Sequence, residues 1–556
     1  MQNFSQAHIL RLFSESAFLL VLICLSQFLY RGVSTRLKFR NMRKQGFPVP
    51  EPYSFILGHI SFMKELKKGL PKDAHSCYSQ RRIAVGWQKF FPQATKCPPI
   101  IYLDLWPFLS QPLILVTSPE ACYQLTQENP QPRDSTFRWA MFPVTRGKDL
   151  ISMNTADHRI WRSRFNPGFS LRNITLQMPI LLEEVGIFAQ QLKSQVGINN
   201  QWGELFTLND RTISLTFDII MRTALDLRLN EQTEGPSPIL KAMRQLLTHV
   251  KSPNLWTKLE RLGPGYRRDV EMQNGIIRNQ LLPQIQSQLA AETSSSNHKT
   301  VISLALQEFR SESDKQDPKE LNSEFIDIVE SQLRLFISAG HDTTAQAICW
   351  ILYRINSNID ILTRLRAEHD EILGANPGDA VQTLSQHPHK LNHMPYTTAV
   401  IKEALRIHPL GSTFRRGSPD FYFVCDGLRY PTENALIQTN PTVVHLRSDL
   451  WPRATEFLPE RFLVAEDHPL HPVKNAWRAF ELGHTRCIGE ELAMMEMKLA
   501  LVLTVRELEF DFDWEGWHKL QKRMVAPDTI DSDYGYRAGD GVGYVKDYLP
   551  TRVKLR

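Results

Sequence analysis

Residues Phe480 to Gly489 read FELGHTRCIG, and a strongly helical run, GEELAMMEMKLALVLTVREL, begins at the last of these residues. Cys487 therefore lies in a glycine-rich loop just before a helix. The N-terminus of a helix presents free N–H groups and the positive end of the helix dipole, and both stabilise a thiolate. The flanking glycines, Gly483 and Gly489, let the backbone approach a flat ligand closely. This setting favours a thiolate at Cys487, although most cysteines beside a glycine are inert.

Composition places few other limits on the chain. It has 556 residues, of which 22% are charged and 42% are hydrophobic, as is ordinary for a globular protein. The net charge of +6 comes without a long basic run or a basic-aromatic ladder, so no nucleic-acid partner is expected. The seven cysteines are odd in number and form no CxxC pair, which argues against a zinc site or a disulfide framework. Scattered cysteines fit a reducing compartment.

The N-terminal region is expected to be a membrane anchor. Residues 17–30 read AFLLVLICLSQFLY, and a bilayer span of about 20 residues is reached by extension back to Ile9, which includes Arg11, Ser14 and Glu15. Six basic residues and no acid follow at 31–44, which places the later chain in the cytoplasm by the positive-inside rule. A cleaved signal peptide is the alternative, but its positive n-region and small-x-small site are not clear here. We expect an anchor at 1–30, a basic and proline-rich linker at 31–52 and one catalytic domain at 53–556.

The rest of the chain indicates a mainly α fold with a small β part. Two strands around a turn are expected within residues 99–116, followed by a helix that Ser118 caps and Pro119 begins. Short strand-like pieces recur near 421–438. Helical periodicity predominates elsewhere. The helices are expected near 171–198, 204–228, 238–250, 268–291, 300–311, 322–356, 358–374 and 396–407.

One expected helix is unusually long. Asn322 to Ile355 would extend roughly 50 Å at 1.5 Å per residue. Because it is apolar nearly all round, it is expected to be buried through the middle of the domain. The segment AGHDTT, Ala339 to Thr344, places polar residues and poor helix formers at its centre. Such a cluster costs stability unless it has partners, so it indicates a functional site, with a satisfied polar patch as the alternative.

The cysteine loop resembles the haem-binding loop of the cytochrome P-450 family, F-x-x-G-x-R-x-C-x-G. Four positions of this chain match that pattern, and they are Phe480, Gly483, Cys487 and Gly489. The resemblance implies a haem whose iron has the thiolate of Cys487 as its axial ligand. The family's arginine, which pairs with a haem propionate, falls on Thr485, while Arg486 stands next to it and His484 replaces a common proline. Loss of that charged hydrogen bond would cost about 1 kcal/mol or more.

Two further segments resemble structural motifs of the same family. Glu403 and Arg406 match its E-x-x-R pair, and residues three apart share one face of a helix. Residues 459–462 match its P-E-R-F segment. The resemblance implies that Arg461 joins Glu403 and Arg406 in a cluster that stabilises the core behind the haem.

AGHDTT is similar to the oxygen-binding motif of the family's central helix. The resemblance implies that Thr343 supports dioxygen and that Asp342 helps to deliver the two protons that O–O cleavage needs. Gly340 is expected to leave room beside the helix for the diatomic molecule.

The propionate partners are expected on two other segments. DHRIWRSRFNPGFS, residues 157–170, resembles the W-x-x-x-R helix before an N-P-x-F stretch, with Arg162 as the arginine and His158 in place of the tryptophan. A basic amphipathic helix is the alternative. Arg415 or Arg416 is a second expected partner. Because these residues would hold the haem, Thr485→Arg is not expected to weaken its retention.

The resemblance also implies an activity, a substrate class and partners. We expect a monooxygenase that inserts one oxygen atom from O2 into an apolar small molecule by hydroxylation, epoxidation or multistep oxidation. The chain has no dinucleotide fingerprint, so NADPH electrons are expected through a separate NADPH-cytochrome P-450 reductase, with cytochrome b5 as a second donor. A basic patch for an acidic reductase is expected from four residues. These are Arg162, Arg164, Arg486 and Lys498.

The sequence around Cys487 is most similar to filamentous-fungal members that tailor polyketide or terpenoid secondary metabolites. We expect a single-pass protein of the endoplasmic reticulum membrane with a cytoplasmic catalytic domain. Substrate-facing residues are expected within 137–151, 336–339 and 411–414. An oxygen-independent haem-thiolate isomerase or dehydratase is one alternative, against which the Asp-Thr pair of AGHDTT argues. A non-catalytic haem-binding membrane protein is the other, and only Thr485 favours it.

Overall fold

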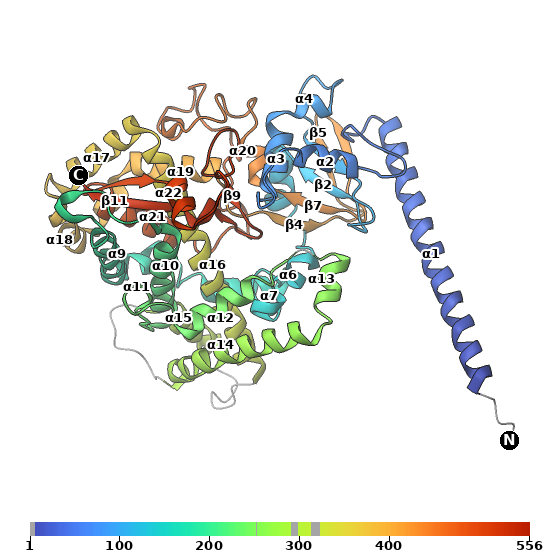
Figure 1. The fold of residues 1–556 in the computed structure, drawn as a ribbon, viewed down its shortest axis with the longest axis horizontal. Helices are drawn as coiled ribbons and strands as arrows, with labels where there is room; N and C mark the ends of the chain where they lie inside the picture. Colours follow the sequence, from blue (N-terminus) through green and yellow to red (C-terminus); the bar gives the residue numbers. More distant parts are fainter. Residues whose placement is uncertain (1–5, 252, 291–298, 313–322) are drawn as a thin grey trace.

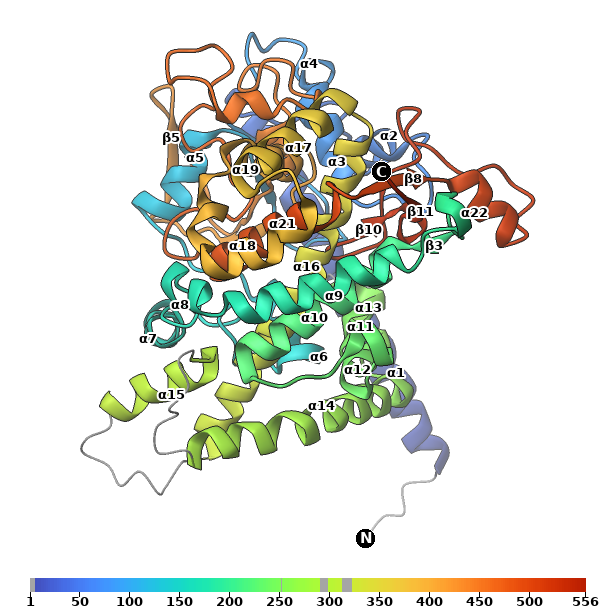
Figure 2. The ribbon, with the colours of Figure 1, turned by 90° about the vertical axis from the view of Figure 1, so that its left-hand side faces the viewer.

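A long central helix organises the helical part of the molecule. The computed structural model describes all but four short parts of the chain, and the described residues are 6–251, 253–290, 299–312 and 323–556. The central helix is α16 (Ser323–Asn356), which is 34 residues long and mostly buried, as its apolar sequence predicts. Figures 1 and 2 show it between α14 (Pro264–Ala290) below and α19 (Pro395–Ile407) above. Asn322, the expected start of this helix, lies outside the described residues.

The other helices agree well with those expected from periodicity. The expected helix at 171–198 is divided in two, because Pro179 begins a new helix and cannot continue the hydrogen-bond ladder of the preceding one. Ser118 caps its helix as expected, with its hydroxyl accepting from the Ala121 N–H at 3.1 Å. The remaining helices are α2 (Ile60–Lys67), α3 (Cys77–Val85), α4 (Trp87–Phe90), α5 (Pro119–Tyr123), α6 (Ser135–Thr145), α7 (Thr155–Phe165), α8 (Leu171–Leu176), α9 (Met178–Lys193), α10 (Leu208–Leu225), α11 (Glu231–Glu234), α12 (Pro238–Leu247), α13 (Leu255–Glu260), α15 (Val301–Glu312), α17 (Ile359–Leu373), α18 (Ala380–Gln386), α20 (Pro441–His445), α21 (Glu490–Thr504) and α22 (Trp514–Leu520).

The β part consists of small sheets at the edges of the helical part. The largest has the strand order β1-β2-β7-β4, in which β2 and β7 are parallel and the outer pairs are antiparallel. The hairpin expected within 99–116 is confirmed as β1 and β2. The C-terminal sheet, of order β3-β11-β8, was not expected from the sequence. The strands are β1 (Ile100–Leu103), β2 (Leu113–Val116), β3 (Phe206–Thr207), β4 (Thr413–Arg416), β5 (Tyr422–Cys425), β6 (Leu428–Pro431), β7 (Leu436–Thr439), β8 (Leu508–Phe512), β9 (Arg537–Ala538), β10 (Tyr544–Val545) and β11 (Pro550–Leu555).

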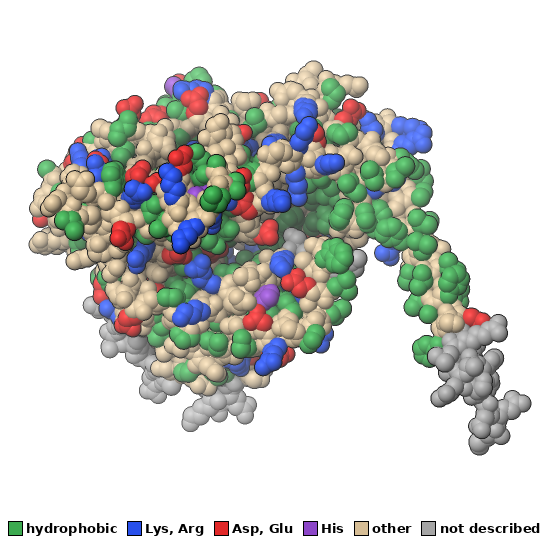
Figure 3. Space-filling model, viewed as in Figure 1, with side chains coloured by type: hydrophobic (Ala, Val, Ile, Leu, Met, Phe, Trp, Pro, Cys, Tyr) green, Lys and Arg blue, Asp and Glu red, His purple; other side chains and the backbone are tan. Residues whose placement is uncertain are grey.

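One helix among the described residues is long and apolar enough to cross a membrane. It is α1 (Gln6–Lys44), and residues 13–44 contain an exposed window with a mean hydropathy of 1.7. Figures 1 and 3 show it as a rod covered by apolar side chains that stands away from the rest of the molecule. The helix does not end at Tyr30, where the anchor was expected to end, but continues to Lys44.

The C-terminal part of α1 packs on the body of the protein. Phe39 and Met42 are buried there. Arg36 is buried too, forms an ion pair with Asp104 and donates to the backbone oxygen of Trp106 at 3.0 Å. Apolar residues within the basic segment therefore pack on the body of the protein, and the helix continues through the segment that was expected to be a linker.

Candidate haem-thiolate site

The loop around Cys487 is held by its own backbone. The N–H of Cys487 donates to the carbonyl of Phe480 at 2.8 Å, and the N–H of Arg486 donates to the carbonyl of Gly483 at 3.1 Å. Gly483 has a φ of +85°, and a Cβ there would lie 2.2 Å from the carbonyl oxygen of Thr126. Both the positive φ and the close approach of the Thr126 backbone require glycine at this position.

The thiol of Cys487 is open to contact by a ligand. The side chain is exposed, yet its surroundings are dense enough that burial raises the pKa of the thiol. The backbone N–H of Gly489 and the charges of Arg162 and Arg486 act in the opposite direction. A Cβ at Gly489 would lie 4.0 Å from the sulfur atom, which leaves the N-terminal side of α21 open. An accessible sulfur at a helix N-terminus can bind a metal ion, which deprotonates a coordinating thiol.

Aromatic and charged residues before the loop fix it to the core. Phe480 packs against Trp477 with ring centroids 6.0 Å apart, and the Trp477 indole donates to the carbonyl of Lys402 in α19 at 3.0 Å. Arg478 is buried, pairs with Glu481 and donates to the Thr126 hydroxyl. Sequence reasoning missed Arg478, which has no motif signal of its own.

Helix α7 brings two of the expected residues to this loop. Arg162 donates to the backbone oxygen of Arg486 at 2.8 Å and to the side chain of Asn166 at 2.7 Å. His158 is buried on the same helix, and burial, followed by the charges of neighbouring arginines, lowers its pKa to about 4. Trp161 instead packs into the core against Phe165. This arrangement agrees with the register that assigns His158 to the tryptophan position.

Strand β4 supplies a third cation. Arg415 is buried and donates to the hydroxyl of Thr485 at 2.5 Å and to the carbonyl of Gln131 at 3.2 Å. Its neighbour Arg416 is exposed, so the structure distinguishes between the two expected arginines. Burial, followed by the charge of Arg415, lowers the pKa of Arg133 to about 9. Sequence reasoning missed Arg133, which lies in the proline-flanked segment PQPRDST.

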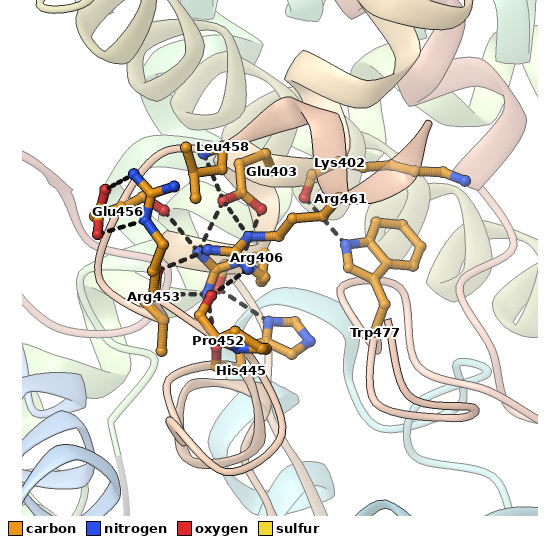
Figure 4. Close-up of polar contacts among 11 residues, drawn as sticks. Lys402, Glu403, Arg406, His445, Pro452, Arg453, Glu456, Leu458, Arg461 and Trp477 are labelled. Atoms are coloured by element: carbon orange, nitrogen blue, oxygen red, sulfur yellow. Dashed lines mark hydrogen bonds and ion pairs between the residues drawn. The ribbon is translucent and has the colours of Figure 1, made fainter. Parts of the chain in front are cut away.

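The expected Glu403–Arg406–Arg461 cluster is assembled in the core (Figure 4). Arg406 donates to Glu403 through Nε at 2.7 Å and through Nη2 at 2.8 Å, and Arg461 donates to Glu403 at 3.1 Å. All three side chains are fully buried. The remaining N–H groups reach backbone oxygens, including those of His445 and Arg453. A buried pair keeps its charge only with such complete hydrogen bonding, so the cluster fixes α19 to the segment that precedes the cysteine loop.

The polar segment of α16 forms an exposed window on a buried helix. Ala339 is exposed, and Asp342 and Thr343 are partly exposed, while the residues on both sides are buried. The Thr343 hydroxyl donates to the carbonyl of Ala339 at 2.7 Å. Burial raises the pKa of Asp342 to about 6. Because α16 packs against α21, the window and the cysteine loop lie on neighbouring elements.

The structure corrects the expectation for Gly340. A Cβ at this position would lie 3.0 Å from Cγ1 and 3.1 Å from Cδ1 of Ile220 in α10. The glycine therefore allows α16 and α10 to pack closely, whereas we had expected it to leave space for dioxygen.

The structure brings together two of the three segments that were expected to face the substrate. Phe137 and Phe414 come from two of these segments, and their rings lie 5.6 Å apart. Phe336, from the third segment, is wrong as a candidate, because it is buried against Phe165 and Phe169.

The exposed basic patch contains fewer of the four expected residues than the sequence suggests. Arg162 contacts the loop, and the guanidinium of Arg164 lies 4.7 Å from the ring centroid of Trp161. Lys498 donates to the Leu391 carbonyl at 3.3 Å. Only Arg486 of the four expected residues is classed as exposed.

These residues fit a haem. The sulfur of Cys487 is accessible, and Gly489 keeps the space beside it open. Among the described residues, Nε2 of His158 and Nε of Arg415 are buried without a hydrogen-bond partner. No ion pair within the described part of the chain includes Arg133, Arg162 or Arg415. A soft sulfur ligand with unpaired cations nearby suits an iron porphyrin that carries two carboxylates.

Comparisons with known proteins agree with this geometry. The sequence profile of the family described as cytochrome P-450 matches residues 89–526. A cytochrome P-450 monooxygenase, polC of Polytolypa hystricis, is 32% identical over 98% of this chain and 96% of its own length. Another, acrF of Aspergillus aculeatus, is 27% identical over 78% of this chain and 87% of its own.

A solved structure supports the fold independently. The haem domain of a cytochrome P-450DA mutant superposes with a TM-score of 0.65 at 19% identity, covering 92% of this chain and 97% of that one. At this identity the likeness establishes the fold alone, whereas the family profile and the fungal relatives establish the activity. The chain belongs to the cytochrome P-450 family and is a haem-thiolate monooxygenase that receives electrons from a separate redox partner.

Proposed function

We propose that this monooxygenase is held in the endoplasmic reticulum membrane by α1, with its catalytic domain in the cytoplasm. It takes NADPH electrons from cytochrome P-450 reductase and inserts one oxygen atom from O2 into an apolar small molecule. We further propose that the reaction is a tailoring step in fungal secondary-metabolite biosynthesis. The fungal sources of the most similar monooxygenases support this last point.

One observation carries the assignment of the site, namely the accessible thiol of Cys487 beside the N-terminus of α21. A haem bound there would supply oxygen activation with a thiolate ligand. Gly483 and Gly489 let the loop approach the flat group, and the loop backbone fixes the direction of the sulfur. Arg162, Arg415 and His158 would hold the carboxylates of the haem, because Arg162 and Arg415 contact the loop and His158 and Arg415 each have a buried ring or guanidinium nitrogen without a partner.

Asp342 and Thr343 handle protons in this proposal. The hydroxyl of Thr343 donates to the carbonyl of Ala339, so the lone pairs of its oxygen remain free to accept a hydrogen bond. The carboxyl of Asp342 has a pKa raised to about 6 by burial, so it exchanges protons near neutral pH. Such a pair serves oxygen chemistry and is unnecessary for an oxygen-independent isomerase.

The test uses the reduced, carbon-monoxide-bound absorption spectrum of the purified full chain. The wild type is expected to give the thiolate-type Soret band, and Cys487→Ser is expected to lose it. The control is Cys97→Ser, which changes a buried cysteine in a separate apolar cluster that also contains Phe90 and Ile101. A thiolate-type band in Cys487→Ser would disprove the ligand assignment.

Substrate and partner require a second experiment. Metabolite profiles of a deletion strain and its parent are compared, and the compound that accumulates is incubated with the protein, the reductase, NADPH and O2. An oxidised product that requires the protein, the reductase, NADPH and O2 supports the proposal. A product formed equally well without O2 would instead identify an isomerase or dehydratase.

A further inference from the structure

Three arginines converge beside the cysteine loop without an acidic partner. Arg133, Arg162 and Arg415 form no ion pair among the described residues, although each lies in surroundings dense enough for burial to lower its pKa. The charge of Asp149 acts on Arg133 and that of Glu481 acts on Arg415. The oxygens of Asp149 accept from Thr145, Ser152 and a backbone N–H group, and Glu481 is paired with Arg478 and accepts from Thr439. Unpaired buried cations are costly unless an anion binds among them.

The backbone brings two of these arginines together. Arg133 and Arg415 stand opposite each other in an isolated antiparallel bridge. Hydrogen bonds on both sides fix this register, from the Arg416 N–H to the Pro132 carbonyl at 2.9 Å and from the Asp134 N–H to the Phe414 carbonyl at 3.2 Å. Like charges directly opposite each other destabilise a strand pair. A register that enforces this contact indicates that the two guanidinium groups share an anionic ligand.

Thr485 explains how the loop manages without the family's arginine. Its hydroxyl accepts a hydrogen bond from Nη2 of Arg415, while Nη1 of the same guanidinium donates to the Gln131 carbonyl. Arg415 is thus held from two sides, with its Nε buried and unpartnered. An arginine at position 485 would remove this acceptor and bring a second guanidinium against Arg415.

We propose that Arg133 replaces the missing loop arginine as a partner of the haem carboxylates, and that Thr485 is a positioning residue that holds Arg415 for the same purpose. The inference rests on the proposed haem site, and it assigns roles to two residues that the sequence pattern leaves without one. It also reverses the expectation for Thr485→Arg, which becomes a variant that weakens haem binding.

The first test compares Arg133→Met with Arg416→Met in the full-length holoprotein. Methionine keeps much of the length of the side chain and removes the charge. Haem loss to an excess of apomyoglobin is followed by absorbance. Arg133→Met is expected to lose haem about tenfold faster than the wild type, because a charge-assisted hydrogen bond is removed. Arg416→Met changes the exposed arginine next to Arg415 in β4 and is expected to match the wild type.

The second test separates positioning from direct binding. Thr485→Val removes the hydroxyl at nearly constant volume, and Thr485→Ser restores it. Faster haem loss is expected in the valine and arginine variants and a normal rate in the serine variant. The iron reduction potential provides a second readout, because carboxylates that lose cationic partners shift it to more negative values. Equal rates in all three variants would overturn the role of Thr485.

These outcomes are distinguishable from a failure of the proposed function. If the wild type gives no thiolate-type spectrum, the haem site itself is wrong. If the spectrum is normal and Arg133→Met retains haem like Arg416→Met, only the role of Arg133 is wrong. Circular dichroism and thermal unfolding of each apoprotein identify a variant that merely misfolds, and Arg133→Lys then retains a charge at the position. Haem loss by the lysine variant at the rate of the methionine variant would overturn the electrostatic role.

Discussion

At the scale of single residues, protonation of Asp342 affects both the proposed proton transfer and the stability of the folded protein. Burial raises the pKa of its carboxyl to about 6 in the folded protein, well above the usual value for aspartate. Between about pH 4 and pH 6 the folded state therefore binds more protons than the unfolded state. The stability of the folded state therefore declines as the pH rises through this range, because the carboxylate of Asp342 then ionises where water solvates it poorly.

Asp342→Asn is expected to lower turnover and to raise stability at neutral pH. The amide cannot transfer a proton, so the rate of product formation is expected to fall about 100-fold or more. The change in rate of the wild type near pH 6 should be absent from the variant. Thermal unfolding should show the variant more stable than the wild type at pH 7, with a smaller difference at pH 5. A wild-type turnover that does not change between pH 5 and pH 7 would contradict this role.

Residues in local motifs could be predicted, and residues that act through distant contacts could not. Cys487, Glu403 and Arg406 each belong to a short pattern whose spacing is set by one loop or one helix. The setting of Arg133 depends on a bridge to Arg415, which is far away in the sequence. No periodicity or spacing encodes such a contact, so only the folded chain reveals it.

At the scale of elements, helices were predicted better than strands for a physical reason. Helical hydrogen bonds are local, and the apolar spacing of segments such as α10 and α16 records which face is buried. Strands β8 and β11 pair with each other, and β11 also pairs with β3, which lies far away in the sequence. These strands are too short to show a clear alternation of apolar and polar residues. The strand with which each one pairs also cannot be inferred from the neighbouring sequence.

The contact between α16 and α10 leads to a prediction about glycine. Gly340→Ala places a Cβ at 3.0 Å from Cγ1 of Ile220, so it is expected to destabilise the protein by about 1–3 kcal/mol through overpacking. Gly186 in α9 is the matched control, because a Cβ there meets nothing within 4 Å. Gly186→Ala is expected to stabilise the helix by about 0.5–1 kcal/mol. Thermal or urea unfolding measures both, and equal effects at the two positions would refute the packing role of Gly340.

At the scale of the whole molecule, α1 belongs both to the proposed anchor and to the body. Residues 13–25 are exposed along their length, whereas Phe39 and Arg36 are buried against the catalytic part. The ion pair between Arg36 and Asp104 fixes the C-terminal part of this helix to the body, while its outer part extends away. The sequence predicted the apolar anchor from composition, but the docked part was hidden in a segment dominated by basic residues. If α1 is the anchor, as proposed, a rigid connection of this kind would set the angle at which the body meets the membrane.

Two truncations test this division of α1. Deletion of residues 2–25 removes only the outer part of the helix, so the protein is expected to keep its haem and its unfolding temperature while shifting from the membrane pellet to the soluble fraction. Deletion of residues 2–45 also removes Phe39 and leaves Asp104 buried without Arg36. The first loss costs about 3–5 kcal/mol and the second a similar amount. Together they approach the whole stability of a typical domain.

The longer deletion is therefore expected to yield unfolded protein or protein without haem. Arg36→Met in the shorter truncation isolates the ion pair and is expected to lower stability by about 3–5 kcal/mol. Arg40→Met is its control, since Arg40 is exposed on the same helix and its loss should change stability by less than about 0.5 kcal/mol. If the longer truncation unfolds at the same temperature as the shorter one, the basic segment is only a tether and the orientation of the body is free.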